Sequence, residues 1–496
     1  MTHWLISRIH FLFLVPLIML ASCAMGPDYT RPVMDIPKSF RMVEGESLAP
    51  SIANLSWWEL LGDEELQRFI RIALRENKDL RRAVASIEEF QARAFIARTD
   101  YIPQIDADIN IPWTRRGGAR IPGFPTPFSH NLQSNLSWEL DIWGRIRRSN
   151  EAALDDLLAR EENRRAVILE LVTGVAEVYF DLLQFDMQLG IAKRTLKSWE
   201  ESVAIARARF EQGMDPQLDV DQFDAERAAA AARVLEFERL IVQKENELNV
   251  LLGRHPVRIP RGRSLTEQVI PPEVPPGLPS ELLQRRPDIM QAEQELAAAT
   301  ARIGVFKAER FPKLTLTGLL GVASPELDKL FTPPSDFGEF GSELMGPVLN
   351  AQILGFQQDA AEAQTRQTLA QYEQTILIAF KEVEDALIGV QTARKQREIQ
   401  ADQVKALQSA LELANLRYEG GVTNYVDVLL AKRLLFDAEL SLTETHRLHL
   451  VSIVQLYKAL GGGWASDGTL IGDSTDSQNS RDISEGPLKP GYRENS

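Results

Sequence analysis

The chain has 496 residues, of which 44% are hydrophobic, 25% are charged and 7% are aromatic, so it can bury a large core and is not a mostly disordered protein. Its slightly negative mean hydropathy excludes a helical membrane protein with many spans. A formal charge of −15 argues against nucleic acid as a partner, because phosphate binding needs a basic surface, and the single cysteine excludes an intramolecular disulfide and a cysteine-rich zinc site.

Residues 1–22 predict a secretory signal with an apolar run from Ile9 to Leu20, which is too short to span a membrane comfortably. Small residues precede Cys23, as in the bacterial lipobox, where the chain is cut before the cysteine and the thiol is acylated. We therefore expect a lipid anchor (palmitate) on Cys23; the alternative is an ordinary signal followed by a buried free cysteine. The next residue is Ala24 and not aspartate, which in bacterial lipoproteins implies transport to the outer membrane.

Five short blocks occur twice in the same order, at an offset of 208 or 209 residues, which indicates two copies of one structural unit. The pairs are Asp79-Leu80 with Asp288-Ile289, Pro103-Gln104-Ile105 with Pro312-Lys313-Leu314, Arg209 to Gly213 with Arg417 to Gly421, Leu218-Asp219-Val220 with Val426-Asp427-Val428, and Leu252-Gly253 with Leu460-Gly461. A proline-rich stretch from Pro271 to Pro279 joins the two copies.

Each copy predicts a helix far longer than those of globular domains. Thirteen positions spaced alternately three and four residues apart, from Ile168 to Phe210, are all apolar, and eleven of the thirteen positions 208 residues later are apolar too. This is the seam of a coiled coil. We expect the first helix to run from Arg145 to Glu211, which is roughly 100 Å at about 1.5 Å per residue.

Each long helix ends at a turn that contains glycine, and we expect a shorter return helix after it, to about Leu252 in the first copy and Leu460 in the second. One further helix is expected ahead of the strands of each copy, over residues 63–99 and 280–310.

Two stretches of alternating apolar and polar residues, near 105–113 and 131–142, predict strands with one apolar face. Segments of about ten residues with this pattern are typical of transmembrane β-barrels; the alternative is a half-buried strand of a soluble sheet. The second copy repeats the pattern at 314–320, and a fourth strand is expected near 340–353. Four strands cannot close a barrel, and open edges are not tolerated in lipid, so several chains would have to share one barrel.

Further motifs surround these elements, namely Gly26 to Pro32, Trp57-Trp58, Arg285 to Ile289, Ala301 to Gly304 and Phe311-Pro312. Together with Cys23 and the two turns they resemble the outer-membrane efflux protein family, the TolC-like channels, and most closely its lipoprotein branch of the OprM/NodT type. The match covers about residues 23–464.

The resemblance implies a mainly α fold with a small β part, in which two tandem repeats form long coiled-coil hairpins and four transmembrane strands per chain join a trimeric α-barrel/β-barrel channel. It implies an outer-membrane exit duct of a tripartite efflux system in a Gram-negative bacterium, a homotrimer that passively conducts small toxic molecules or ions. The implied partners are a periplasmic membrane-fusion adaptor, an inner-membrane pump of the RND type acting indirectly, and outer-membrane lipid. No cofactor and no metal site is expected.

The sequence and the resemblance together predict six segments along the chain. They are a signal (1–22), a lipid anchor with an N-terminal collar segment (23–62), a first repeat (63–255), a proline-rich linker or collar (256–280), a second repeat (281–464), and a polar tail expected to be disordered or loosely packed (465–496).

In the family, the helical turns close the periplasmic end of the duct, and the matching acids here are Asp219 and Asp427, one per repeat. In a trimer each acid would form a ring of three, which attracts cations and is costly to bring together, so we expect a periplasmic gate in which Tyr418 bonds across helices. The alternative is that each acid only complements a helix dipole. Leu430 stands where the family often has a second acid, and Thr423 where TolC has a latch arginine, so that latch is not reproduced.

The turn residues that dock the adaptor in the family have matches in both copies, namely Gly213, Met214, Gly421 and Val422. Alternatively, the glycines only permit the turn, because glycine tolerates positive φ.

A second set of acids belongs to the polar faces of the first two strands. If those faces line the lumen, we expect a preference for cations from Asp106, Asp108, Glu139 and Asp141.

An enzyme is not expected. His446 and His449 lie one helical turn apart, but no third ligand follows with motif spacing, and the common hydrolase, protease and nucleotide-binding motifs are absent. Two other functions stay open. One is a non-porous, lipid-anchored periplasmic coiled-coil scaffold, which would not need the strands, and the other is a type I secretion duct. Nothing in the sequence identifies the cargo.

Overall fold

The computed structural model describes residues 24–37, 39–41, 52–56, 60–111, 130–268, 279–348, 351–422 and 425–463. The expected signal, Cys23, Trp57-Trp58, Thr423 and the C-terminal tail therefore lie outside the described residues. Among the residues that are described, no helix combines the length and the apolar character needed to cross a membrane.

The chain forms two compact units. The sheet unit comprises Met1–Met34, Val84–Glu162 and Gln291–Gln374, and the hairpin unit comprises Asp35–Ala83, Asn163–Met290 and Thr375–Ser496. Four of the five unit boundaries fall inside helices, and each unit takes material from both repeats.

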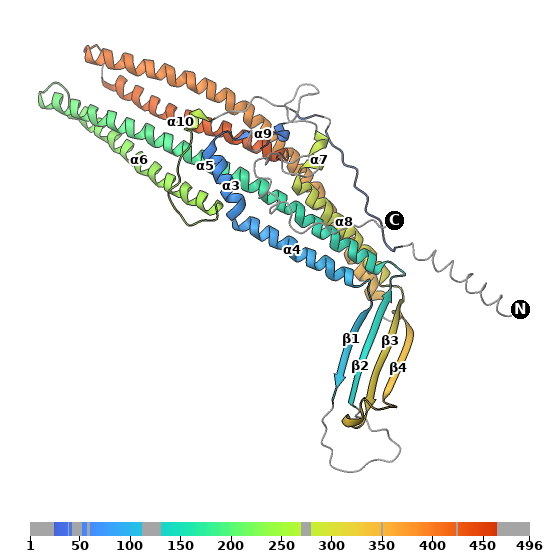
Figure 1. Ribbon diagram of the computed structural model, residues 1–496. Coiled ribbons are helices and arrows are strands. Elements are labelled where there is room, and N and C mark those ends of the chain that lie inside the picture. The colour runs from blue at the N-terminus through green and yellow to red at the C-terminus, as the bar shows by residue number, and fades with distance from the viewer. Residues whose placement is uncertain are drawn as a thin grey trace. The chain divides into compact units, whose positions relative to one another are not determined.

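The two repeats have the same order of elements (Figure 1). The first contains α3 (Glu64–Glu76), α4 (Lys78–Thr99), β1 (Gln104–Asn110), β2 (His130–Leu140), α5 (Arg145–Glu211) and α6 (Gln217–Leu251). The second contains α7 (Leu282–Arg285), α8 (Pro287–Ala308), β3 (Lys313–Ser324), β4 (Asp336–Met345), α9 (Ala351–Glu419) and α10 (Tyr425–Ala459). Short 3-10 helices lie at Ile52–Asn54, Leu265–Glu267, Pro279–Glu281 and Leu327–Lys329. The expected mainly α fold with a small β part and two tandem repeats is confirmed.

The long helix α5 has the bounds expected from its apolar seam. Every seam position from Ile168 to Ala206 is buried or half-buried, and only Phe210, in the last turn, is exposed. Helix α9 keeps the same register, and all thirteen equivalent positions are buried or half-buried, including the polar Arg397 and Gln400. A stripe that repeats every three to four residues must face other helices, which explains why sequence alone located this element.

The helix expected at 63–99 is two helices. Asn77 separates α3 from α4, because its side-chain oxygen accepts the N–H of Leu80 (3.0 Å) and its amide donates to the carbonyl of Leu251 (2.9 Å). The helix expected at 280–310 is also divided. Pro287 opens α8, and a residue that precedes proline is disfavoured in helical conformation, which ends α7 before Arg286.

The four strands form one antiparallel sheet in the order β1-β2-β3-β4 (Figure 1). Strand β4 lies at Asp336–Met345 and not near 340–353, because it pairs residue for residue with β3, from Val322 opposite Asp336 to Lys313 opposite Met345. The strand ends just before Gly346-Pro347, and proline has no N–H for a ladder bond.

A buried acid holds part of the segment between the repeats in the hairpin unit. Asp63 caps α3 by accepting the N–H of Glu65 (2.9 Å), and its other oxygen accepts the N–H of Arg263 (3.0 Å) and the amide of Gln268 (2.8 Å). The hydroxyl of the fully buried Tyr179 donates to the same carboxylate (3.3 Å). Residues 262–268 are thereby fixed against α3 and α5.

Candidate functional site

Both hairpins of the hairpin unit turn through the same backbone geometry, at the same end of that unit (Figure 1). Gly213 and Gly421 have φ of +72° and +70°, and no atom lies within 4 Å of the position a Cβ would take, so conformation and not space requires glycine. The N–H groups of Met214 and Val422 each donate to the carbonyl five residues earlier, at 2.9 Å. Their side chains are 59% and 71% exposed, so both turns present an apolar side chain to solvent.

An aromatic cluster joins the two hairpins behind these turns. Trp199 on α5 contacts Phe223 on α6 with ring centroids 6.1 Å apart, and Phe223 contacts Tyr425 on α10 at 3.5 Å. Tyr425 in turn meets Tyr418 on α9 edge-on at 5.6 Å. Four rings from four helices therefore form one small core, which holds the two hairpins against each other.

Asp215, which the sequence analysis did not select, is the acid that Tyr418 contacts. The guanidinium of Arg209 donates to both carboxylate oxygens of Asp215 (2.6 and 3.2 Å) and lies over the Tyr418 ring at 5.2 Å. The Tyr418 hydroxyl donates to the same carboxylate at 3.4 Å. The bond from Arg209 holds the pKa of Asp215 below its usual range, so this carboxylate is charged at neutral pH. The arrangement links the first turn to α9 of the second hairpin.

The expected gate acids both lie in the first turn of a return helix, Asp219 in α6 and Asp427 in α10. Burial, and then repulsion from Asp215, raise the pKa of Asp219. Asp427 is exposed and lines, with Arg417 and Leu430, a groove of about 270 Å³ between α9 and α10. An acid in the first turn of a helix complements the helix dipole, and both acids have this position.

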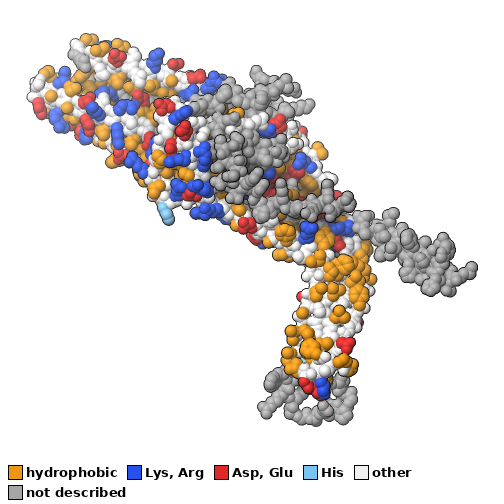
Figure 2. Space-filling model, viewed as in Figure 1, with side chains coloured by type: hydrophobic (Ala, Val, Ile, Leu, Met, Phe, Trp, Pro, Cys, Tyr) orange, Lys and Arg blue, Asp and Glu red, His pale blue; other side chains and the backbone are white. Residues whose placement is uncertain are grey.

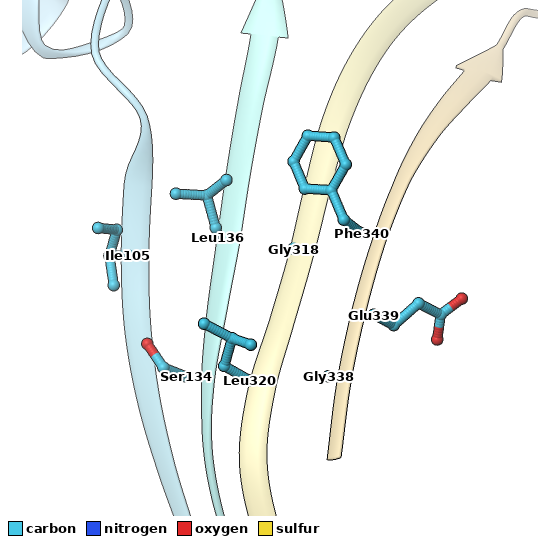
Figure 3. A pocket seen from close by; sticks show the side chains of 8 residues that line it. All are labelled: Ile105, Ser134, Leu136, Gly318, Leu320, Gly338, Glu339 and Phe340. Carbon is cyan, nitrogen blue, oxygen red and sulfur yellow. The ribbon is translucent and has the colours of Figure 1, made fainter.

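One face of the sheet is mainly apolar, and all four strands contribute apolar side chains to it. The strand register brings Ile105, Leu136, Gly318 and Phe340 into one row across the sheet. Around this row lies a hollow of about 500 Å³, and Figure 3 shows the apolar side chains that line it. Phe340 is 74% exposed, and Figure 2 shows hydrophobic side chains gathered over the strands while most charged ones lie over the helices. An exposed apolar face of this extent requires an apolar partner.

The opposite face of the sheet is polar and acidic. Asp106, Asp108 and Glu139 alternate with the apolar positions, and the amide of Asn135 donates to Asp108 across the β1–β2 pair (2.6 Å). The register adds two acids of β4 to this face, since Glu339 lies in one row with Asp106, and Glu343 lies in one row with Glu139. Neither acid could be placed from the sequence alone, because the start and the facing of β4 depend on its pairing with β3.

Two of the expected lumen acids are tied to the start of α5. Glu139 pairs with Arg145 through two hydrogen bonds (2.8 and 3.0 Å). Asp141 lies beyond the end of β2, and its oxygens accept the backbone N–H groups of Ile146 (3.0 Å) and Arg147 (2.9 Å). Asp141 thus caps a helix end instead of lying on the strand face, a role set by the strand-to-helix junction.

The segment that follows Cys23 is fixed to the sheet unit. The N–H of Met25 donates to the carbonyl of Trp143 (2.9 Å), and the buried Arg148 on α5 pairs with Asp28. Arg31 binds Glu293 on α8 through two bonds (2.7 and 2.8 Å), and the Tyr29 hydroxyl donates to the same carboxylate. The first motif that carried the family resemblance is therefore tied to α5 and α8.

The histidine pair lies on α10, where His449 is buried and His446 is half-buried. Burial, and then repulsion from Arg397, lowers the pKa of both His446 and His449 to about 4, so both rings are neutral at neutral pH. Nowhere in the described ranges do three or more His, Cys, Asp or Glu side chains gather as they would around a metal ion.

The two repeats coincide with the two matches to a family model described as "Outer membrane efflux protein", at residues 69–254 and 278–462. The cation efflux system protein CusC of Escherichia coli O6:H1 is 33% identical over 449 residues, which cover 90% of this chain and 96% of CusC. The probable efflux pump outer membrane protein TtgC of Pseudomonas putida is 34% identical over 462 residues, which cover 90% and 93% of the two chains.

Among solved structures, the open state of the MtrE outer membrane channel of Neisseria gonorrhoeae aligns with a TM-score of 0.80 at 31% identity, and the alignment covers 89% of this chain and 98% of MtrE. The expected family is thereby confirmed. The chain belongs to the outer membrane efflux protein family, a family of channels and not of enzymes, and it is an outer-membrane component of an efflux system.

Proposed function

We propose that three copies of this chain form one passive exit duct, which conducts small toxic molecules or ions out of the cell. The observation that carries the proposal is the sheet with one apolar and one acidic face. Strands β1 and β4 each pair on one side only within the described chain, and such edges are not tolerated in lipid. Twelve strands from three chains would remove the edges, turn the apolar faces to lipid and enclose the acidic faces.

The enclosed face would favour cations. Four acids lie on this face without a strand cation beside them in the register of the described strands, namely Asp106, Asp108, Glu339 and Glu343. Glu139 lies on the same face but is paired with Arg145. Among the described strand residues of this face, Lys313 is the single cation. Three copies of these acids around one lumen create a negative potential, which attracts cations and repels anions.

The gate is assigned to the hairpin turns. Rings of Asp219 and Asp427 would narrow the axis where the turns of three chains meet. The contact of Tyr418 with Asp215 would hold the two hairpins of each chain together in this closed arrangement. Met214 and Val422, exposed on turns built by Gly213 and Gly421, supply the apolar contact for a periplasmic adaptor, which connects the duct indirectly to an RND-type inner-membrane pump.

The membrane anchor is assigned to a lipid on Cys23. The described chain begins at Ala24, and the segment that follows is fixed to α5 and α8 by Arg148 and Arg31. A lipid at that point would be held at a defined place on the sheet unit and not on a free tether.

The test is conductance of the purified protein in a planar bilayer, with wild type beside the double variant Asp219→Ala/Asp427→Ala. A small wild-type conductance that rises in the variant supports both the pore and the acid gate. Equal conductance of the two proteins would support the duct and show that these two acids do not form the seal. Silence in both, despite confirmed insertion, favours the non-porous scaffold, and passage of an unfolded polypeptide instead of small solutes would favour a type I secretion duct. Anion selectivity would refute the assignment of the acidic face to the lumen.

A further inference from the structure

Lys432 is a partly buried cation that the proposed duct does not yet use. It lies on α10 of the second hairpin, and its ammonium reaches α5 of the first hairpin. The Nζ atom donates to the hydroxyl of Ser202 (2.6 Å) and to the carbonyl of Ser198 (3.3 Å), and it lies 5.1 Å from the ring of Trp199. Trp199 is only 2% exposed, so the ammonium closes over a buried indole at the junction of the two hairpins.

The energetics of this contact are unusual. The ammonium is held by neutral acceptors and a ring face, and Glu201 contributes only a longer-range attraction. Burial lowers the pKa of Lys432, which shows that the charged form is poorly solvated there. When the hairpins part, the ammonium regains water, so this contact is easier to break than an apolar one of equal area.

The other repeat shows that a hairpin does not need this lysine. The position 208 residues earlier is Asp224 on α6, which pairs with Arg227 on its own helix at the surface. The position equivalent to Trp199 is Leu407, which lines the open groove beside Asp427. The cation–indole contact is therefore specific to the junction between the two hairpins of one chain.

We propose that Lys432 is a positioning residue of the gate, which holds the second hairpin to the first through Trp199 and Ser202 and releases it when the duct opens. The proposal rests on the proposed duct with its gate at the turns. It assigns the opening movement to the α5–α10 junction within each chain, where the ammonium can exchange its protein contacts for water.

The experiment compares Lys432→Met with wild type in planar bilayers, with the exposed Lys405→Met on α9 as the matched control. Methionine keeps the length and packing of the side chain and removes the charge. We expect the open probability to fall about fivefold in Lys432→Met, because methionine keeps the contact with Trp199 but gains no hydration when the hairpins part, with no change in Lys405→Met. Lys432→Arg should restore the wild-type value, because arginine also stacks on an indole and donates hydrogen bonds.

A merely structural role predicts a different result. The thermal midpoint of Lys432→Met should equal or exceed that of wild type, since the charge is removed from a poorly solvated place; a lowered midpoint without rescue by arginine overturns the proposal. If Lys432→Met fails to insert, Ser202→Ala removes the 2.6 Å hydrogen bond alone and should raise the open probability by a smaller factor.

Conductance also separates this proposal from the duct itself. If Asp219→Ala/Asp427→Ala opens the channel and neither Lys432→Met nor Ser202→Ala changes the open probability, the positioning role is wrong and the duct stands. If no variant conducts despite insertion, the duct fails, and the positioning role fails with it.

Discussion

The hairpins α5–α6 and α9–α10 share a backbone and differ in the contacts at their turns. Their glycines have nearly equal φ at positions 208 residues apart, at both the turn and the far end of the return helix. Arg209 is matched by Arg417, but Asp215 is matched by Thr423, which lies outside the described residues. Duplication has therefore kept what the backbone requires, while the side chains that join one hairpin to the other have diverged.

The largest expected loss of stability comes from substituting a glycine that both hairpins share. Gly253 and Gly213 have similar φ (+70° and +72°), but an added Cβ at Gly253 would lie 2.3 Å from the carbonyl oxygen of Glu76, whereas Gly213 has open space. We expect Gly253→Ala to cost roughly 3 kcal/mol and Gly213→Ala about 1 kcal/mol, because the first adds a backbone clash to the same strain. Thermal unfolding of both variants measures this. Equal losses would show that φ alone sets the glycine requirement.

Lowering the pH should destabilise the second hairpin more than the first. His446 and His449 have Glu238 and Ile241 as their equivalents in the first hairpin. Their folded pKa of about 4 lies below the usual value of 6.5, so their stabilisation is complete above pH 6.5 and is lost as the pH falls from 6.5 to 4. The groups that face them from α9 are Arg394, Arg397 and Glu398, and two of these three repel the protonated rings.

We expect a loss of roughly 3 kcal/mol for protonation of the well-buried His449. The measurement is the thermal midpoint between pH 7 and pH 4, for wild type and for His446→Gln/His449→Gln, with the exposed His255→Gln as control. The double variant should lose less stability on acidification. A wild type and a double variant with parallel pH profiles would contradict the assignment.

Removing the contacts of Arg209 at the first turn should change stability less than the substitutions above. Arg209→Ala removes the partner of Asp215 and the cation over Tyr418, whereas Arg417→Ala changes the equivalent residue in the other hairpin. The pair is partly exposed, so we expect a loss below about 1 kcal/mol from Arg209→Ala, together with a higher open probability than in Arg417→Ala. Bilayer recordings of the two variants test this prediction. Equal open probabilities would show that the contact with Asp215 takes no part in gating.

Thr423→Asp should produce the smallest change. It places an acid at the position that matches Asp215, six residues after Arg417, as Asp215 follows Arg209. We expect a gain of a few tenths of a kcal/mol and a slightly lower open probability, because a new ion pair at a turn is largely screened by solvent. Thr423→Asn is the uncharged control, and a lower open probability in both variants would point to a steric cause.

The parts of this protein that local patterns specify were readable from its sequence. The seam from Ile168 to Phe210 predicted a very long helix α5 that ends at Glu211, and the repeated blocks predicted the order of elements in both halves. Gly213 and Gly421 predicted the turns. Each of these depends on residues within a few turns of helix or on a duplicated motif, so no knowledge of distant contacts was needed.

Contacts between residues far apart in the sequence decided the rest. Pairing with β3 set the bounds of β4 and placed Glu339 and Glu343 on the acidic face, while the junction of β2 with α5 made Asp141 a helix cap. The packing of α9 and α10 against α5 joined Tyr418 to Asp215 and Lys432 to Trp199. The facing of a strand and the rotation of a helix depend on the partner that each one meets, and local periodicity does not name that partner.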